Sequence, residues 1–204
     1  VVSIFVNPTQ FNNAEDLQKY PRTLEKDTTL LESLGVHFVF APTAEEMYSA
    51  EEMQARFSFD FNGLDEVMEG KMRPGHFNGV VQVVSRLFEL VRPTRAYFGE
   101  KDFQQLAIIR HMVEHSTLSS NFNNLKIVGC PIVREASGLA LSSRNERLSD
   151  NEKQTAVAIS QTLIASLEWA KTDSLEEVQK RVIDTINAID GLEVEYFEIV
   201  DKTT

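Results

Sequence analysis

The sequence has few of the residues that mark secreted, membrane-spanning or nucleic-acid-binding proteins. Its single cysteine, Cys130, excludes an internal disulfide and favours a reducing compartment such as the cytosol. No apolar run approaches the ~20 residues needed to cross a bilayer. Positive charge is also scarce, because 20 Lys and Arg stand against 31 Asp and Glu and leave a net charge of -11. Any phosphate site must therefore rely on local lysines, arginines and backbone donors, and a nucleic-acid partner is not expected.

Histidine is scarce too, and its spacing does not indicate a structural zinc site. The four histidines are not arranged with cysteines. His111 and His115 are four residues apart on a predicted helix and could share a metal, but no acidic third ligand follows at a matching spacing. A surface helix explains the pair better, and we assign no transition metal.

The hydrophobic content of 42% is sufficient for a full core, and the chain alternates predicted strands and helices. Buried strands are predicted at 1–6, 36–41, 95–98 and 125–133, a further strand at 194–200, and helices at 23–34, 80–91 and 103–115. Leu24, Leu31 and Leu34 are expected to face inward. The alternation predicts an α/β fold with a parallel sheet.

Local signals add detail to this outline. Capping-box patterns at Thr43, Ser149 and Ser174 predict a short helix and two helices of roughly 18 and 15 residues. Phe57, Phe59 and Phe61 alternate before an Asn62-Gly63 turn, which predicts a strand outside the parallel core. Loops are expected at 70–79 and 116–124. We place a domain boundary near Ser149.

Both ends of the sequence suggest that it continues. The chain begins without methionine on an apolar strand that would need neighbours on both sides, and it ends four residues after the strand at 194–200. We therefore expect that the chain is cut at its start and at its end.

The first stretch with chemical character is 97–106, where a strand, Gly99, a charged turn and a helix follow one another. In an open parallel sheet this junction lies at the carboxyl end of a strand, where backbone N–H groups and the helix dipole favour a phosphate or carboxylate. Gly99 would let the backbone turn sharply, and Lys101 would lie beside the anion. Taken alone, the four turn residues favour an ordinary solvated turn.

The second stretch is 134–147, which is small, polar and rich in hydroxyls and arginine. Hydroxyls and backbone N–H groups donate hydrogen bonds to a phosphate, and a guanidinium adds a forked charged contact. Composition alone favours a surface loop, because serine, glycine and asparagine are ordinary loop residues.

Five motifs in order resemble the pantothenate synthetase (pantoate-beta-alanine ligase) family over residues 1 to about 200. They are Phe-Val-Asn-Pro-Thr-Gln-Phe at 5–11, Tyr-Pro-Arg-Thr at 20–23, Arg-Pro-Gly-His-Phe at 73–77, Phe-Gly-Glu-Lys-Asp-Phe-Gln-Gln at 98–105 and Leu-Ser-Ser-Arg-Asn at 141–145. Chance does not supply all five at once, so the resemblance overturns the two loop interpretations.

The resemblance implies a Rossmann-like nucleotidyltransferase domain with a parallel sheet, over 1–148 and without its first strand and helix, followed by a smaller, incomplete α+β domain over 149–204. It implies an adenylate-forming ligase, usually a cytoplasmic homodimer. ATP adenylates pantoate with loss of pyrophosphate, and the beta-alanine amine then displaces AMP to give pantothenate. A related nucleotidyltransferase acting on another acid or a phosphate, and a non-catalytic nucleotide-binding fragment, are the alternatives.

The resemblance also carries over residue roles. Gln10 and Gln105 match the positions that hold pantoate, and Gln10 also lies where beta-alanine arrives. ATP binding is implied for nine positions: Gly99, Glu100, Lys101, Asp102, Val133, Leu141, Ser142, Ser143 and Arg144. Of these, Lys101, Ser142 and Arg144 are assigned to stabilise phosphate charge during catalysis. The family uses Mg²⁺ with ATP, and Asp27 is assigned as a contact to it.

Two further points follow from the same motifs. Arg73 and His76 match a family loop, with a structural role as the alternative. The family's His-x-Gly-His type motif would precede Val1, and none of the four histidines replaces it. We therefore expect the 204-residue chain alone to be severely impaired.

Overall fold

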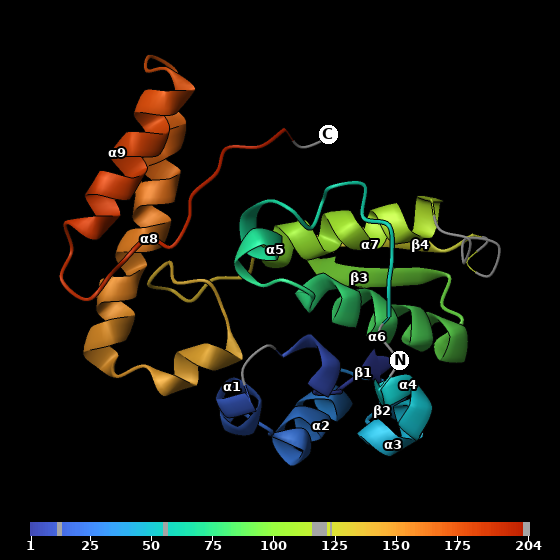
Figure 1. Ribbon diagram of the computed structural model, residues 1–204. Helices are drawn as coiled ribbons and strands as arrows, with labels where there is room; N and C mark the ends of the chain where they lie inside the picture. The colour runs from blue at the N-terminus through green and yellow to red at the C-terminus, as the bar shows by residue number, and fades with distance from the viewer. Residues whose placement is uncertain (12–13, 55–56, 116–121, 123, 202–204) are drawn as a thin grey trace. The chain divides into compact units, whose positions relative to one another are not determined.

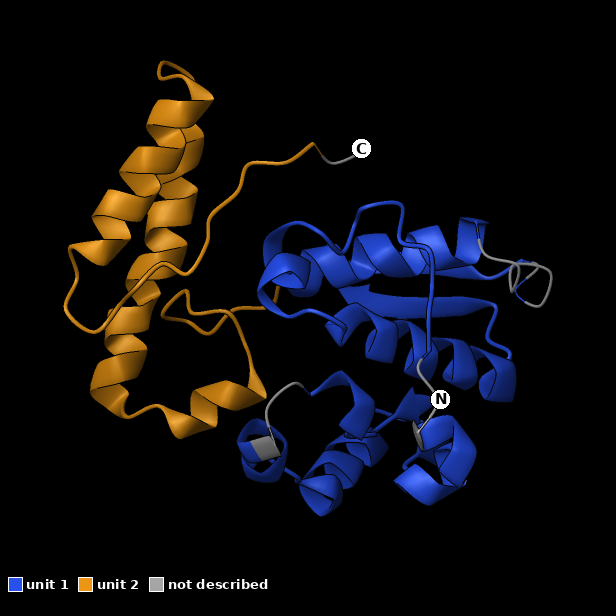
Figure 2. Cartoon of the chain, viewed as in Figure 1, with its two compact units in different colours: residues 1–130 blue, residues 131–204 orange. Residues whose placement is uncertain are grey.

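The computed structural model describes residues 1–11, 14–54, 57–115, 122 and 124–201. The chain divides into two compact units, Val1–Cys130 and Pro131–Thr204 (Figure 2). The division by contacts falls before Ser149, where the sequence places the boundary between family domains, and that boundary stays a prediction. The loop predicted at 116–124 lies mostly outside the described residues.

Unit 1 alternates strands and helices (Figure 1). In chain order its elements are β1 (Val2–Ser3), η1 (Pro8–Gln10), α1 (Ala14–Lys19), α2 (Leu24–Ser33), β2 (Val39–Phe40), α3 (Ala44–Met47), α4 (Ala50–Gln54), α5 (Met68–Met72), α6 (His76–Val91), β3 (Arg95–Gly99), η2 (Glu100–Asp102), α7 (Phe103–His115) and β4 (Lys126–Cys130). The α/β class predicted from the sequence is confirmed.

The parallel pairing is confirmed, but the described strands form two separate pairs. β1 pairs with β2, and β3 pairs with β4 in register from Arg95 opposite Lys126 to Gly99 opposite Cys130. A groove of about 370 Å³ lies between β1 and β3, and it is lined by mostly apolar residues of β1, α6 and β3. The strands predicted at 1–6 and 36–41 are only two residues long in the described structure, and β1 has a partner on one side alone among the described residues.

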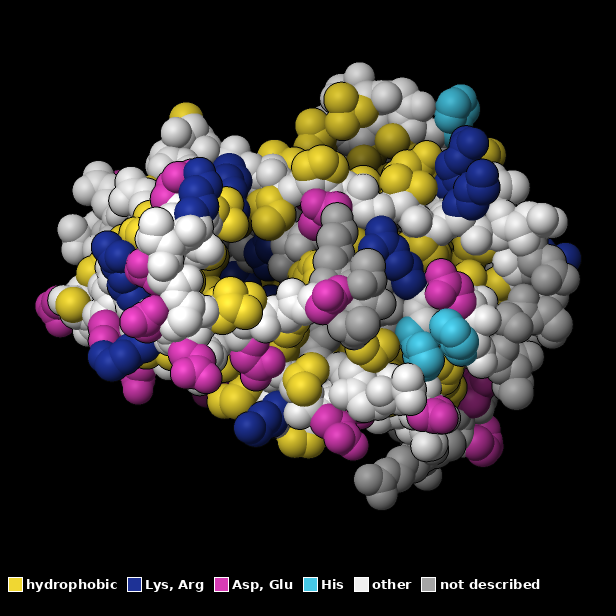
Figure 3. Space-filling view, turned by 90° about the horizontal axis from the view of Figure 1, so that it is seen from above, with side chains coloured by type: hydrophobic (Ala, Val, Ile, Leu, Met, Phe, Trp, Pro, Cys, Tyr) yellow, Lys and Arg dark blue, Asp and Glu magenta, His cyan; other side chains and the backbone are white. Residues whose placement is uncertain are grey.

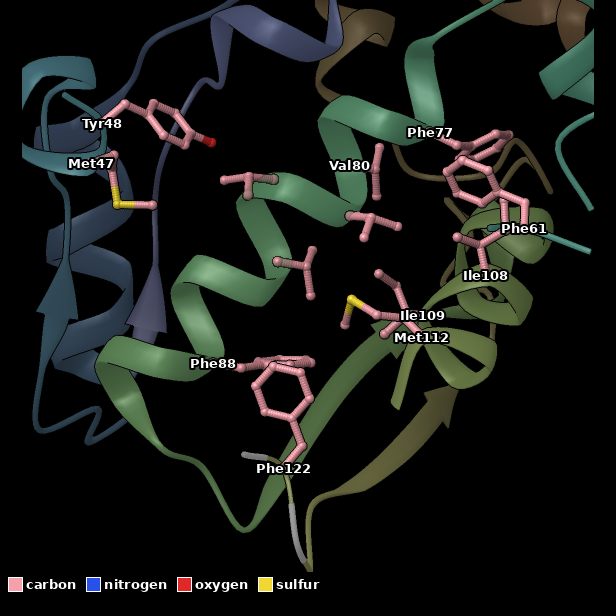
Figure 4. Close-up of a cluster of buried hydrophobic side chains, with 13 residues drawn as sticks. Met47, Tyr48, Phe61, Phe77, Val80, Phe88, Ile108, Ile109, Met112 and Phe122 are labelled. Carbon is pink, nitrogen blue, oxygen red and sulfur yellow. The ribbon is translucent and has the colours of Figure 1, made fainter. Parts of the chain in front are cut away.

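The main core of unit 1 lies between α6 and α7. Figure 4 shows Phe77 and Val80 of α6 pointing toward Ile108, Ile109 and Met112 of α7. Helical spacing brings these side chains to facing stripes, so the two helices bury each other's apolar surface. The helix predicted at 103–115 is confirmed as α7, in which Leu106, Ile109 and Met112 are buried and Val113 is partly buried.

Several local predictions for unit 1 are wrong. The phenylalanines at 57–61 form no strand, because their rings pack into the core: Phe59 and Phe61 meet edge to face with centroids 5.1 Å apart. The predicted loop at 70–79 holds the end of α5 and the first turn of α6. Leu24 and Leu34 are exposed, because they stand at the two ends of α2.

Unit 2 contains η4 (Ser143–Arg147), α8 (Asp150–Trp169) and α9 (Leu175–Asn187). The capping boxes predicted at Ser149 and Ser174, like that at Thr43, are all formed. The strand predicted at 194–200 is absent from the described structure. That segment instead follows α9, where the Gln179 amide donates to the carbonyl of Phe197 at 2.7 Å and Val194 packs against the buried face of the helix.

Candidate active site

The junction predicted to hold phosphate has the predicted order of elements. β3 ends at Gly99, η2 covers the charged turn, and α7 begins at Phe103. No side chain caps the start of η2, so its first backbone N–H groups stay open to a ligand. The reason given for Gly99 is wrong, because its φ of -72° suits any residue and nothing lies within 4 Å of the position that a β-carbon would take.

Lys101 and its neighbours form an exposed, weakly tied charge cluster. The Lys101 ammonium lies 3.3 Å from a carboxylate oxygen of Asp102, and the two side chains are 42% and 58% exposed. An ion pair this exposed contributes little, so the ammonium can move to a bound anion at small cost.

The two adjacent glutamines of α7 have opposite environments. Gln104 is buried, where its amide nitrogen donates to the carbonyls of Leu64 and Val67 at 2.7 Å and its oxygen accepts from the Gly70 N–H at 3.2 Å. Gln105 is partly buried, and its side chain makes no hydrogen bond to any residue that the structure describes. Gln104 therefore supports the fold, while the Gln105 amide is left for a ligand.

Gln10 resembles Gln105 in this respect. It ends η1, and its side chain also has no hydrogen-bond partner within the described ranges, although its backbone carbonyl accepts from Arg73 and His76. Arg73 and His76 thus contact the turn at Pro8–Gln10, called the Gln10 turn below, which agrees with the structural role left open for them. α6 packs against both η1 and α7, the elements that carry the two free amides.

Asp27 has the environment of a helix residue with one polar neighbour. Its carboxylate accepts from the Thr23 hydroxyl at 3.0 Å. No cluster of three or more His, Cys, Asp or Glu that could hold a metal occurs in the described parts of the chain. A lone carboxylate suits an ion that brings most of its ligands with it, such as Mg²⁺ on phosphate oxygens, and does not suit an ion held by protein alone.

In unit 2 the segments carrying the other predicted ATP residues meet in a hairpin. The Leu141 N–H donates to the carbonyl of Val133 at 2.9 Å, beside a bridge between Arg134 and Ala140. Ser142 then caps η4, its hydroxyl accepting from the N–H of Arg144 at 3.3 Å. The hairpin leaves Leu141, Ser143 and Arg144 exposed on one short run.

Charged side chains of both signs are interspersed over the surface seen in Figure 3. A single broad basic face, which nucleic-acid binding usually requires, is therefore not what this view presents. None of the helices in the described residues is long and apolar enough to span a membrane.

Comparison with known proteins identifies the family. The family model for pantoate-beta-alanine ligase matches residues 1–204. The chain belongs to this family. The pantothenate synthetase of Phocaeicola vulgatus is 61% identical over 204 residues, which are 100% of this chain and 70% of that protein. The enzyme of Flavobacterium psychrophilum is 53% identical, again covering 100% of this chain and 70% of its relative.

Solved structures of pantoate-beta-alanine ligases have the same fold. A crystal structure from Thermus thermophilus is 44% identical and has a TM-score of 0.89, covering 98% of this chain and 71% of that one. The Francisella tularensis enzyme, described as complexed with beta-gamma ATP and beta-alanine, is 36% identical with a TM-score of 0.78 over 98% and 70% of the two chains. The chain is therefore assigned the activity of its family, the condensation of pantoate with beta-alanine, which forms an amide bond.

The resemblance to pantoate-beta-alanine ligases left several residues around the Gln10 turn without a role. Asn7 and Tyr48 are buried and joined by a hydrogen bond, and Gly79 lies against the turn itself. Asn7 stands inside one of the five family motifs, so its position was a usable signal. Tyr48 follows a short capped helix 41 residues later, and nothing in its local sequence links it to Gln10.

Proposed function

We propose that the chain forms pantothenate through a pantoyl adenylate, with pantoate held between Gln10 and Gln105. The observation that carries this assignment is that the partly buried amides of Gln10 and Gln105 have no protein partner among the described residues. Gln104, which precedes Gln105, makes three hydrogen bonds to backbone groups instead. An amide can bond hydroxyl and carboxylate oxygens without adding a competing charge. Gln10 is also proposed to meet the incoming beta-alanine.

The proposed reaction has two displacements. A pantoate carboxylate oxygen attacks the α-phosphorus of ATP, and the bond to the bridging oxygen breaks as pyrophosphate leaves. The beta-alanine amine then attacks the acyl carbon, a C–N bond forms, and AMP departs with the C–O bond electrons while the nitrogen gives up a proton. Only the first step requires ATP phosphates to be held against growing charge.

We assign ATP binding to two segments. In unit 1 these are Gly99, Glu100, Lys101 and Asp102, where open N–H groups at η2 and the loosely paired ammonium of Lys101 suit a phosphate. In unit 2 the hairpin and cap supply Val133, Leu141, Ser142, Ser143 and Arg144. Lys101, Ser142 and Arg144 are the proposed catalytic residues, because ammonium, hydroxyl and guanidinium groups donate to developing phosphate charge.

Mg²⁺ is proposed to enter as a complex with ATP, with Asp27 as its one protein carboxylate. Magnesium keeps several waters and usually takes one or two carboxylates together with substrate phosphates. We further propose a cytoplasmic homodimer and a family domain boundary near Ser149.

Isotope exchange between pyrophosphate and ATP tests the proposal. In the natural full-length protein, exchange should require pantoate and should proceed without beta-alanine, because adenylation precedes amine attack. The matched variants are Gln105→Ala, which should weaken the response to pantoate, and Gln104→Ala, which should weaken the fold instead. Exchange that is equally fast without pantoate would rule out the proposed order.

A further inference from the structure

The Gln10 turn lies directly against the amino end of α6. A β-carbon on Gly79 would lie 2.6 Å from the carbonyl oxygen of Thr9 and 2.8 Å from the α-carbon of Gln10. The Asn7 amide nitrogen also donates to the Gly79 carbonyl at 3.0 Å. The backbone of the turn is therefore seated on the helix without room for displacement toward it.

Asn7, the residue that precedes η1, is held by a buried hydrogen bond to Tyr48. Asn7 is 1% exposed, and its side-chain oxygen accepts from the hydroxyls of Tyr48 and Thr9, each at 3.2 Å. Tyr48 is itself 5% exposed and belongs to the main core, where Figure 4 shows its hydroxyl pointing away from the Met47 side chain toward α6. Bonds buried this deeply are not exchanged readily for water, so they fix Asn7.

The last residue of the turn, Gln10, is held by a series of contacts between polar and charged side chains. His76, 9% exposed, has its Nδ1 2.8 Å from the carbonyl oxygen of Gln10 and its Nε2 3.4 Å from a guanidinium nitrogen of Arg73, which pairs with Glu69 at 2.8 Å. A carbonyl only accepts and a guanidinium only donates, so Nδ1 carries the proton and Nε2 accepts. The two contacts thereby fix the orientation of the ring.

These contacts fix the backbone of Gln10 and leave its side-chain amide free of protein partners in the described structure. We propose that His76 and Tyr48 are positioning residues, which hold the Gln10 turn from its two ends and act on pantoate only through the Gln10 amide. This inference rests on the proposed role of Gln10. It assigns no contact between substrate and either His76 or Tyr48.

The distinction between the two imidazole nitrogens supplies a matched pair of variants. The side-chain nitrogen of asparagine falls near the place of Nδ1, whereas that of glutamine falls near Nε2. His76→Asn should keep the donor to Gln10 and retain the pantoate KM within about twofold, the range of an unperturbed hydrogen bond. His76→Gln should raise the pantoate KM about tenfold with kcat little changed, because Gln10 is proposed to bind pantoate equally well in the ground state and in the transition state. Tyr48→Phe should raise the pantoate KM about threefold, since the Thr9 hydroxyl still donates a hydrogen bond to Asn7.

The decisive experiment is a double-mutant cycle with Gln10→Ala in the natural full-length protein. If His76 acts through Gln10, His76→Gln should add nothing to the pantoate KM once the amide is gone. An unchanged tenfold increase in the Gln10→Ala background would overturn the proposal. Tyr48→Phe repeats the cycle with a variant that loses only one oxygen, in case His76→Gln does not fold.

A second readout separates this proposal from the role of Gln10 itself. In ¹⁵N-labelled protein without substrate, His76→Gln should shift the side-chain amide resonances of Gln10, and His76→Asn should leave them close to the parent. Equal shifts in both variants would overturn the positioning role. If those resonances behave as expected but Gln10→Ala leaves the pantoate KM unchanged, the positioning holds and the proposed pantoate contact fails.

Discussion

Two turns follow parallel strands at the carboxyl ends of β1 and β3, and the protein holds them in opposite ways. The turn at Pro8–Gln10 is enclosed, with a buried asparagine beneath it, a close glycine beside it, and an arginine and a histidine side chain on its last carbonyl. The turn at Glu100–Asp102 is exposed, without a capping side chain, and its Lys101–Asp102 ion pair joins two neighbours in the chain.

The difference matches the two ligands proposed for these turns. Pantoate is small and must be oriented for attack, so a rigid amide limits the freedom it loses on binding. A triphosphate changes charge distribution during the reaction, and a loosely tied ammonium can follow that change. The rigid turn at Pro8–Gln10 is thus suited to orient pantoate, and the exposed turn at Glu100–Asp102 is suited to stabilise phosphate charge.

The largest expected effect is at the exposed turn. Lys101→Ala in the natural full-length protein should lower the adenylation rate by about 10² to 10³ fold, or roughly 3 to 4 kcal/mol, the scale of one lost donor to a developing anion. Pantoate binding and thermal stability should hardly change, because the side chain is 42% exposed and makes a weak pair. Single-turnover adenylation at saturating ATP and pantoate measures the effect, with thermal melts as the folding control.

An adenylation rate equal to that of the parent would show that Lys101 belongs to an ordinary solvated turn. Phosphate charge would then have to be met elsewhere, and Arg144→Ala is the matched variant for that outcome. Asp102→Asn serves as the control for local charge, since it removes the Lys101 ion pair and keeps the ammonium.

The second prediction compares the two glycines. Gly79→Ala should destabilise unit 1 by about 1 to 3 kcal/mol, because the new methyl group meets backbone atoms of Thr9 and Gln10 that cannot swing away. Gly99→Ala should leave stability unchanged, since its φ is ordinary and its surroundings are open. Chemical denaturation of both variants checks this pair.

Equal losses of stability in the two variants would contradict the contrast between the turns. The Gly99→Ala variant has a second use, because a methyl group there can obstruct only a ligand. Normal stability with weakened ATP binding would support close approach of a phosphate to this backbone.

Sequence reasoning reached further at the exposed turn than at the enclosed one. The order of strand, turn and helix from Arg95 to His115 follows from local periodicity and is present in the structure. The three capping boxes were equally readable, because each is completed within four residues. Family motifs added Gln10 and Gln105, whose ligand contacts stay predictions.

The enclosed turn could not be derived in this way, because its contacts join residues far apart in the chain. Tyr48 reaches Asn7 across 41 positions and Asn7 reaches Gly79 across 72. The phenylalanines at 57–61 show the same limit, since core packing overrode their strand-like alternation. The prediction for Gly99 was wrong for a different reason: glycine suggested a sharp turn of the backbone, and the backbone is extended there.

The third prediction concerns the two glutamines of α7. Gln105→Ala should raise the pantoate KM about tenfold with kcat and stability little changed, because it removes one hydrogen-bonding amide with no protein partner among the described residues. Gln104→Ala should instead destabilise the fold by about 1 to 3 kcal/mol, since the Gly70 N–H and the carbonyls of Leu64 and Val67 lose their hydrogen-bond partner. Steady-state kinetics and denaturation of both variants separate the roles. A pantoate KM unaffected by Gln105→Ala would remove this residue from the pocket.

The smallest effect on stability is expected at Tyr48, where the pH dependence of the parent and of Tyr48→Phe should differ only at high pH. Burial raises the pKa of the Tyr48 phenol to about 12, with a smaller contribution in the same direction from the Glu52 charge and opposing ones from Thr9 and Arg86. Ionisation is thus easier in the unfolded chain, where the phenol has its ordinary pKa of about 10. The stabilisation by the neutral phenol is complete below pH 10 and is lost as the pH rises toward 12.

The melting temperature of the parent should therefore fall more steeply than that of Tyr48→Phe over this interval, and the two curves should run parallel from pH 7 to 9. The two proteins differ in no other ionisable group, so the difference isolates Tyr48. Parallel curves up to pH 12 would mean that the Tyr48 hydroxyl exchanges with water and does not hold Asn7.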